Sequence, residues 1–293
     1  MERTTPDDLL EKVLDSYEGT PDARLREIML SLVRHLHGFV NDVQLTQDEW
    51  MAAIGILTAT GDITDDRRQE FILWSDTLGI SMLVDALANP LPEGAMESTV
   101  MGPFYVPGSP RREYGADLRE GPGGTAAWVH GQVQSLDGEP IAGAELDIWQ
   151  NGAEGLYAVQ DAEGPEDHLR GVIESRDDGS YAFIGVRPIP YTVPHDGPVG
   201  EMIESTARHP WRPAHIHMIV RAPGYRTLAT HIFDSTSDYL DSDAVYAVKP
   251  SLLREFVPRA ADDPERPPGV EGEWCAVRND IVLAPENTDG GDR

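Results

Sequence analysis

A six-residue run in the second half of the chain carries side chains that can bind a metal ion. Residues 212–217 read Arg-Pro-Ala-His-Ile-His. Because successive side chains of a β-strand point to opposite faces, a strand here places His215 and His217 on the same side. Two imidazoles on one face can form half of a metal site, and Arg212 can stabilise an anion beside it. Ordinary strand histidines would give the same pattern, so the run alone leaves both interpretations open.

Two tyrosines upstream of this run are the next candidates for metal ligands. Tyr157 follows Glu-Gly-Leu, Tyr191 follows Arg-Pro-Ile-Pro, and both contexts are typical of loops. A buried tyrosine is normally a core residue whose hydroxyl bonds a neighbour. Spacing alone therefore does not distinguish a ligand from a core residue at either position.

The composition excludes several classes of protein. The chain has 293 residues, 40% of them hydrophobic, which suffices for one large domain or two smaller ones. Its one cysteine, Cys275, permits neither an internal disulfide nor a cluster of thiolate ligands. No run approaches the roughly 18 consecutive apolar residues of a transmembrane helix, and the first residues lack the apolar region of a signal peptide. We therefore expect a cytoplasmic protein that does not associate with membranes.

The chain is strongly acidic. Its formal net charge is −28, from 23 basic and 51 acidic residues, and Lys12 and Lys249 are its only lysines. An acidic surface repels nucleic acids and anionic membranes, so neither is expected as a partner. We interpret the acidity as an adaptation of the solvated surface rather than as a binding site.

The first hundred residues show helical periodicity. Leu25, Ile28, Leu32 and Leu36 follow the spacing of one buried stripe along a helix. A longer helix is expected over residues 66–88. Its apolar residues surround it, so it should be buried on most sides by a second domain, a subunit partner or both.

From about residue 99 the pattern changes to short alternating runs separated by turn signals. The expected strands cover residues 129–133, 144–148, 181–183, 214–220 and 228–233. Many short strands without helical spacers are typical of an antiparallel β-sandwich. We predict a mainly β fold with α, in which residues 1–98 form an N-terminal helical dimerisation and linker domain. Residues 99–293 would form a β-sandwich domain that carries the candidate site.

Several runs together resemble the intradiol ring-cleavage dioxygenases, and within that family the hydroxyquinol 1,2-dioxygenase branch. The similarity extends from about Thr64 to about Phe256. The runs that carry it are Arg68–Phe71, Ser81–Asp85, Val100–Phe104, Gly143–Gln150, Pro188–Tyr191 and Arg212–His217. The last two are the most specific in order and spacing. The run Asp241–Val245, with Val248 and Lys249, is more similar to hydroxyquinol and chlorocatechol members than to plain catechol enzymes.

The resemblance implies a mononuclear Fe(III) site in the sandwich domain, one ion per subunit, with Tyr157, Tyr191, His215 and His217 as protein ligands. By position in the family pattern, Tyr157 and His217 should be equatorial, and Tyr191 and His215 axial. Phenolate is a hard anionic donor that suits Fe(III), whereas zinc prefers His, Cys and carboxylate ligands. A bound cation also holds a phenol deprotonated although its free pKa is about 10.

The implied reaction is the cleavage of a catechol-type ring by O₂ between its two hydroxylated carbons, which gives a muconate. By the family pattern, the substrate would chelate the iron through both oxygens and displace Tyr191 and a bound hydroxide, which would accept its protons. Arg212 would stabilise the carbanionic form of the substrate inside a dry pocket. Tyr191 and Arg212 are therefore the expected catalytic residues, and a surface arginine is the alternative for Arg212.

The family pattern also implies which side chains line the substrate pocket. They are Leu73, Asp76, Val100, Met101, Gly102, Pro103, Phe104, Val193, Pro194, Arg212 and Val245. Asp76 could accept a hydrogen bond from the third hydroxyl of benzene-1,2,4-triol, and a buried carboxylate left unpaired would discriminate against catechol. A helix-surface position is the alternative for Asp76. His231 is either a donor behind the metal ligands or a core histidine.

Three functions follow from these observations. We expect cleavage of hydroxyquinol to 3-hydroxy-cis,cis-muconate (maleylacetate) in aromatic catabolism, and a catechol or chlorocatechol 1,2-dioxygenase is the alternative within the family. A metal-free β-sandwich that binds ligands or partners is the alternative outside it, since runs like residues 129–148 also occur in binding modules. The resemblance further implies a homodimer formed through the helical part, with a phospholipid bound between the helices. Core packing explains the same apolar residues without a lipid.

Overall fold

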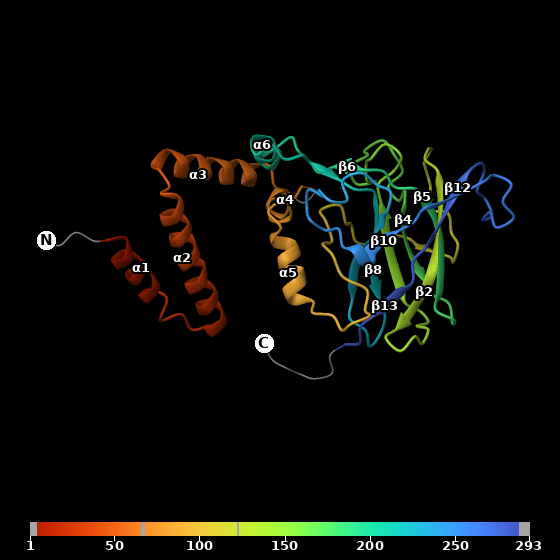
Figure 1. The fold of residues 1–293 in the computed structure, drawn as a ribbon, viewed down its shortest axis with the longest axis horizontal. Coiled ribbons are helices and arrows are strands. Elements are labelled where there is room, and N and C mark those ends of the chain that lie inside the picture. Colours follow the sequence, from red (N-terminus) through yellow and green to blue (C-terminus); the bar gives the residue numbers. More distant parts are fainter. Residues whose placement is uncertain (1–4, 66–67, 122, 287–293) are drawn as a thin grey trace. The chain divides into compact units, whose positions relative to one another are not determined.

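The computed structural model describes residues 5–65, 68–121 and 123–286. The chain divides into two compact units, Met1–Ala59 and Thr60–Arg293. The helices between residues 60 and 98 belong to the second unit. The domain boundary after residue 98 remains a prediction. Figure 1 traces the elements in chain order.

The first unit consists of helices. They are α1 (Pro6–Asp15), α2 (Ala23–Val43) and α3 (Gln47–Asp62), the last of which continues into the second unit. Thr5 begins α1 in a capping box with Asp8, so two backbone N–H groups at this end are satisfied. The carboxylate of Asp22 caps α2 in a similar way. Local signals in the sequence therefore fix where these helices begin.

The apolar stripe predicted along α2 is exposed in the single chain. Leu25 and Ile28 are 48% and 47% exposed, Leu32 and Leu36 are 47% and 53% exposed, and Val33 is the buried residue of this helix. The prediction of a buried stripe is wrong within one chain, because α1, which packs against α2, is short and has no buried residue itself. Such a stripe is typical of a surface that another chain or a ligand covers.

The single long helix predicted over residues 66–88 is in fact two helices. α4 (Glu70–Thr77) and α5 (Ile80–Ala88) meet at a bend of 78°, and Asp66, the predicted start, lies outside the described residues. Gly79 lies between them with a φ of +73°, a left-handed conformation that glycine adopts without a Cβ clash. No single helix in the described ranges is both long enough and apolar enough to span a membrane. The bent pair of α4 and α5, taken together, has that length and composition.

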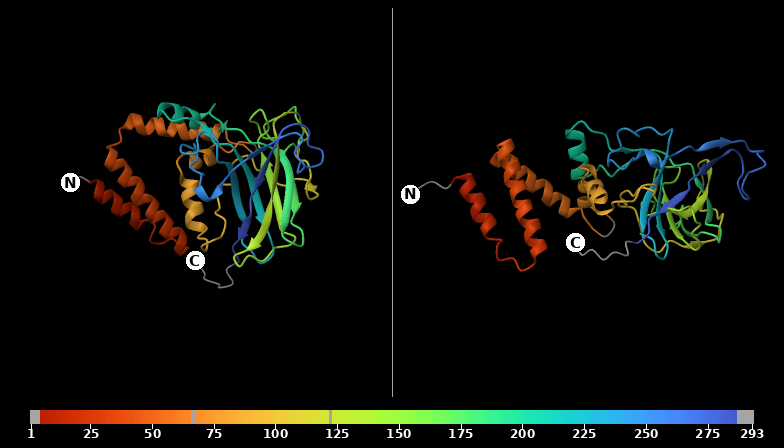
Figure 2. Two further views of the ribbon diagram at one scale, coloured as in Figure 1. Left: turned by 45° about the vertical axis from the view of Figure 1, so that its right-hand side comes forward. Right: turned by 60° about the horizontal axis from the view of Figure 1, so that its bottom comes forward.

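The second unit is built around two packed sheets. Its strands are β1 (Arg111–Arg112), β2 (Ala126–Ser135), β3 (Glu145–Gln150), β4 (Arg170–Glu174), β5 (Ser180–Val186), β6 (Tyr191–Thr192), β7 (Trp211–Arg212), β8 (His215–Arg221), β9 (Leu228–Asp234), β10 (Leu253–Arg254), β11 (Val257–Arg259), β12 (Trp274–Arg278) and β13 (Ile281–Leu283). The other helices are α6 (Pro198–Ser205) and the 3-10 helix η1 (Pro250–Leu252). The larger sheet has the order β1-β4-β3-β8-β9-β10, the other joins β11-β12-β2-β13 with β5 against β2, and β6 pairs with β7. In Figures 1 and 2, α4, α5 and α6 lie on the same side of these sheets.

The five predicted strands are confirmed and lie in β2, β3, β5, β8 and β9. The central pairs β3 with β4, β3 with β8, β8 with β9, and β2 with β5 are antiparallel, as the sandwich prediction requires. Other strands add parallel pairs, namely β1 with β4, β10 with β9, and both β12 and β13 with β2. The result is a mixed α and β fold with a sandwich at its centre.

Alternation along the central strands separates the core from the candidate site. The side chains of β8 that belong to the main core cluster are Ile216, Met218 and Val220. His215 and His217 alternate with them and so face the opposite side of the same sheet. A second, smaller apolar cluster contains Trp149, Tyr157 and Tyr191. The sheet thus provides a rigid support for both histidines.

Gly131 in β2 is a position from which a side chain is excluded. A Cβ there would lie 1.9 Å from the carbonyl oxygen of Asn279, which accepts a hydrogen bond of 2.7 Å from the hydroxyl of Tyr181. We expect Gly131→Ala to lower the free energy of unfolding by about 3 kcal/mol, the upper end for added atoms in a packed core, because the obstacle is backbone. Chemical denaturation would measure the change. Gly55→Ala, within α3, should not destabilise the protein, because an added Cβ there meets nothing within 4 Å. Equal midpoints for the two variants would contradict the prediction.

Candidate metal centre

The four predicted metal ligands come from separate parts of the second unit. His215 and His217 belong to β8, and Tyr157 lies in the turn-rich segment after β3. Tyr191 begins β6, and the pairing of β6 with β7 sets it opposite Arg212. Each of the four predicted ligands is at most 5% exposed, so these side chains are shielded from bulk water.

The polar atoms of these side chains gather around one centre. The Nε2 atoms of His215 and His217 are 3.1 Å apart, and the hydroxyl oxygen of Tyr157 lies 3.4 Å and 3.0 Å from them, respectively. Nη1 of Arg212 lies 3.2 Å from the hydroxyl oxygen of Tyr191 and 3.2 Å from Nε2 of His215. The rings of Tyr157 and Tyr191 meet edge to face, with centroids 5.3 Å apart. The structure therefore brings all four predicted ligands together beside a guanidinium.

The two imidazoles offer lone pairs to this centre. Nδ1 of His215 lies 2.7 Å from the carbonyl oxygen of Pro213, so we assign the proton to Nδ1 and a lone pair to Nε2. Burial, and then the charge of Arg212, lowers the pKa of His215 well below its ordinary value. Burial, followed by His215 and Arg212, has the same effect on the pKa of His217. Both rings are therefore neutral at physiological pH, which is the state that binds a metal ion.

The tyrosines complete a donor set that fits trivalent iron. Burial raises the pKa of Tyr157 well above its ordinary value, and the phenol of Tyr191 raises it further. A bound metal ion reverses this preference and stabilises the phenolate. Two phenols and two imidazoles, without a thiolate, suit a hard trivalent ion better than zinc. Tyr157, Tyr191, His215 and His217 could therefore hold Fe(III).

Arg212 is held in the site by a carboxylate that sequence reasoning missed. Asp243 accepts hydrogen bonds from Nε of Arg212 at 3.0 Å and from Nη2 at 3.4 Å, and the two side chains are 3% exposed or less. Burial lowers the pKa of Arg212, but Asp243, Tyr191 and Tyr157 raise it by more, so the guanidinium stays charged. The surface alternative for Arg212 is wrong. Asp243 belongs to the run Asp241–Val245, but no sequence spacing linked it to Arg212.

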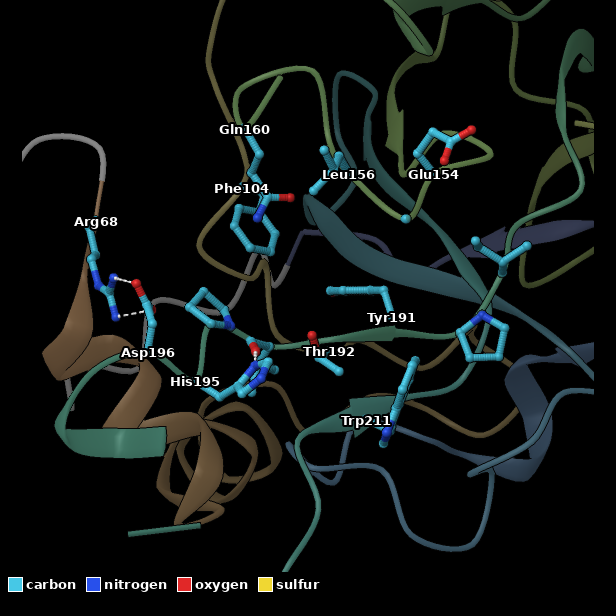
Figure 3. Close-up of a pocket in the computed structure, with 15 residues that line it drawn as sticks. Arg68, Phe104, Glu154, Leu156, Gln160, Tyr191, Thr192, His195, Asp196 and Trp211 are labelled. Atoms are coloured by element: carbon cyan, nitrogen blue, oxygen red, sulfur yellow. Dashed lines mark hydrogen bonds and ion pairs between the residues drawn. The ribbon is translucent and has the colours of Figure 1, made fainter. Parts of the chain in front are cut away.

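A cavity of about 640 Å³ opens beside the candidate metal centre. Four predicted site residues line it, namely Phe104, Tyr191, Val193 and Pro194, together with side chains that were not predicted, among them Arg68, Gln160, His195, Asp196 and Trp211. Figure 3 shows Arg68 bonded to Asp196 at this cavity, with Phe104 and Tyr191 nearby. The ring of Phe104 stacks on Tyr157 with centroids 4.8 Å apart. The walls of this cavity are therefore partly apolar or aromatic and partly charged.

The other predicted pocket residues do not line this cavity. Leu73, Val100 and Val245 are buried in the main hydrophobic cluster. Met101 is 46% exposed, and Pro103 is half-buried in the turn before Phe104. Gly102 lies against the metal centre, where an added Cβ would be 3.3 Å from Cε1 of His217. Of these positions, only Gly102 is in close contact with a predicted metal ligand.

Asp76 is a buried carboxylate on α4. It is 3% exposed, which excludes the surface position considered for it. Burial raises its pKa, while a hydrogen bond from Ser81 and the charge of Arg212 oppose that rise. Asp76 thus lies within electrostatic reach of the guanidinium of Arg212, although it does not line the cavity.

His231 adds a third imidazole to the centre. It lies directly opposite His217 in the pairing of β9 with β8 and is fully buried. The metal-binding nitrogens of His215, His217 and His231 all lie within 4.8 Å of one another. Nδ1 of His231 bonds the hydroxyl of Thr99, and its Nε2 has no partner in the described part of the chain. His231 therefore combines the features of a core histidine with those of a donor behind the ligands.

Sequence models of two protein families match the chain. One, described as "Catechol dioxygenase N terminus", matches residues 22–96. The other, described as "Dioxygenase", matches residues 100–285, which is more than half of the sequence. The two matches adjoin near the predicted domain boundary.

Several known proteins are similar over most of the length. A hydroxyquinol 1,2-dioxygenase of Nocardioides simplex is 47% identical over 281 residues, 95% of each chain. A 6-chlorohydroxyquinol 1,2-dioxygenase of Cupriavidus pinatubonensis is 50% identical over 250 residues, 85% of this chain and 90% of its own. The structure of a hydroxyquinol 1,2-dioxygenase from Pseudomonas putida matches with a TM-score of 0.90 at 45% identity, over 96% of this chain and 99% of that one. A catechol 1,2-dioxygenase from Pseudomonas arvilla matches with a TM-score of 0.84 at 28% identity, over 99% and 95%.

Proposed function

Because the chain belongs to the intradiol dioxygenase family, we propose that it cleaves hydroxyquinol (benzene-1,2,4-triol) with O₂. The bond between two adjacent hydroxylated carbons breaks, and both atoms of O₂ enter the product. The product is 3-hydroxy-cis,cis-muconate (maleylacetate). Relatives named for hydroxyquinols are 47% and 50% identical over 95% and 85% of this chain, which supports this substrate. The observation that carries the proposal is the gathering of two phenol oxygens and two imidazole nitrogens beside a buried arginine.

We propose one Fe(III) per subunit, held by Tyr157, Tyr191, His215 and His217. When bound, ferric iron withdraws electron density from a chelated catecholate and so makes the ring reactive toward O₂. The side chains around the iron accept the substrate proton, stabilise the developing charge and exclude water. With the metal bound, Tyr191 is a phenolate whose oxygen can accept one substrate proton, and Arg212, 3.2 Å from that oxygen, stabilises the negative charge left on the ring. The stacked rings of Phe104 and Tyr157 exclude water from the reacting carbon atoms.

The visible spectrum of the purified protein tests the proposal. Tyrosinate-to-Fe(III) charge transfer should colour it wine-red, and anaerobic addition of benzene-1,2,4-triol should shift the absorption band. Oxygen uptake should have a higher kcat/KM with benzene-1,2,4-triol than with catechol or chlorocatechols. A preference for catechol would favour the alternative within the family. A colourless protein that takes up no iron would favour a metal-free binding module.

Asp76 is proposed to select the triol by accepting a hydrogen bond from its third hydroxyl. We expect Asp76→Ala to lower kcat/KM for benzene-1,2,4-triol by about 10- to 100-fold, the usual cost of a lost hydrogen bond to a charged group. The value for catechol should stay constant or rise, because no buried carboxylate is then left unpaired. Oxygen-electrode assays of both substrates would measure the ratio. Equal losses on the two substrates would contradict a role of Asp76 in selectivity.

We also propose that the protein is a homodimer formed through its helical part. The exposed stripe of Leu25, Ile28, Leu32 and Leu36 supports this, and a phospholipid bound between the helices would cover part of the same surface. Light scattering should give twice the 32.2 kDa of one chain, and mass spectrometry of an organic extract would detect the lipid. The cytoplasmic location and the domain boundary after residue 98 remain predictions.

A further inference from the structure

The two imidazoles of the proposed metal site are held in different ways. A metal-bound imidazole usually donates its other ring N–H to a carbonyl or carboxylate, which fixes the orientation of the ring. His215 follows this rule through the carbonyl oxygen of Pro213, at 2.7 Å. Nδ1 of His217 is buried and has no hydrogen-bond partner among the residues that the structure describes. On its Nδ1 side, this second ring is therefore held by packing instead of a hydrogen bond.

A row of rings across three strands supplies that packing. Trp149 of β3 lies directly opposite His217 of β8, which lies directly opposite His231 of β9. The indole of Trp149 stacks on His217 with centroids 4.7 Å apart and an angle of 13° between the planes. His231 meets His217 at 4.2 Å and 60°. Cross-strand neighbours on one face of a sheet lie about 5 Å apart, so strand pairing itself brings these rings into contact.

Trp149 is held in place by its neighbours, and it contacts His217 through the flat face of its indole. It is 3% exposed, and the ring of Tyr105 packs on it with centroids 4.9 Å apart. The hydroxyl of Tyr105 donates a hydrogen bond of 2.9 Å to Asp147, which anchors that ring. Nε1 of Trp149 has no partner within the described ranges, so hydrogen bonding does not explain an indole here. The stacking of the indole face on His217 is the interaction that explains a tryptophan at this position.

We propose that Trp149 is a positioning residue for His217. Its indole fixes the plane of the imidazole and thereby aims the Nε2 lone pair at the metal. An imidazole that has given its lone pair to a cation becomes electron-poor, and the electron-rich face of an indole attracts it more strongly than it attracts a neutral ring. Trp149 thus favours the metal-bound state over the metal-free state. This inference rests on the proposed ligation of Fe(III) by His217.

The rate at which a chelator removes iron tests this role, together with the charge-transfer band. Trp149→Leu removes the flat ring but keeps an apolar side chain, and Trp149→Phe keeps a flat ring. Trp274→Leu is the matched control, because Trp274 is 2% exposed, belongs to a different apolar cluster and has no partner for its Nε1 in the described residues either. All variants are loaded with iron before the chelator is added.

We expect iron to leave Trp149→Leu about 10- to 100-fold faster than the wild type, the usual cost of losing support behind a metal ligand. Its charge-transfer band should also shift. Trp149→Phe should stay within about threefold of the wild type, because a second aromatic ring retains most of the stacking. Trp274→Leu should match the wild type in both measurements, although it loses an indole from the core as well.

Two results would overturn the role of Trp149 while leaving the iron site intact. One is an unchanged release rate and band in Trp149→Leu, and the other is a release rate from Trp149→Phe as fast as that from Trp149→Leu. Wild-type protein that takes up no iron would instead overturn the proposed function itself. If Trp149→Leu does not fold, Trp149→Met replaces it with the same expected results, because a flexible methionine fills irregular space without a flat face.

Discussion

Tyr157→Phe is expected to fold, to be nearly colourless and to consume O₂ at no more than about one hundredth of the wild-type rate. The substitution deletes a phenol oxygen 3.0 Å from Nε2 of His217 but keeps the ring that stacks on Phe104. Loss of a group behind a ligand lowers metal affinity by about 10- to 100-fold, and loss of a ligand should cost more. Iron content, visible absorption and an oxygen electrode would measure these effects.

Tyr181→Phe is the matched control for this prediction. Tyr181 is also fully buried, and its hydroxyl donates to the carbonyl oxygen of Asn279 in the core. Its loss should lower the free energy of unfolding by about 1 kcal/mol while colour and oxygen uptake persist. If Tyr157→Phe also keeps its colour and its activity, the proposed ligand set is wrong.

Arg212→Gln is expected to lower kcat by about 100- to 1000-fold with the iron retained, the usual effect of removing one electrostatic stabiliser from a closed site. Nη1 of Arg212 lies 3.2 Å from the hydroxyl oxygen of Tyr191, which the substrate is proposed to displace. A neutral, shorter glutamine cannot stabilise the charge that then develops on the ring. Oxygen uptake at saturating benzene-1,2,4-triol would measure kcat, and the charge-transfer band would report the iron.

The same substitution leaves Asp243 buried without its ionic partner. We expect this to lower the free energy of unfolding by about 3–5 kcal/mol. The double variant Arg212→Gln/Asp243→Asn separates the two effects, because it removes both charges. Its stability should largely recover while kcat stays low. Recovery of kcat together with stability would show that Arg212 acts only through the fold.

The strands of the sandwich could be predicted because their signals are local. Alternation and flanking turns identified β8 and β9 from a few residues each. The bend between α4 and α5 could not be predicted, because Gly79 interrupts an apolar pattern that continues on both sides and single glycines also occur inside helices. Periodicity likewise showed that α2 has an apolar face but not what covers it.

The candidate site depended on contacts that no local pattern encodes. Tyr157 and His215 are 58 positions apart, and only resemblance to a family grouped them as possible ligands. The ion pair of Arg212 with Asp243 spans 31 positions. The stack of Trp149 on His217 exists because of the register between β3 and β8. Residue types indicated the chemistry, but tertiary pairing decided which groups act on one another.

The alternation along β8 bears on how the range of ring substrates could be widened by directed evolution. Its odd-numbered positions from His215 to Ile219 face the side of the candidate metal centre, and the even-numbered positions between them belong to the main hydrophobic core. A library that keeps His215 and His217 and varies other residues on their side of the sheet, such as Phe104, would sample new specificities at little cost in soluble yield. The same number of changes at Ile216, Met218 and Val220, which belong to the core, would mostly produce aggregates. Selection for new substrates can therefore proceed on one side of a single sheet while the other side keeps the molecule folded.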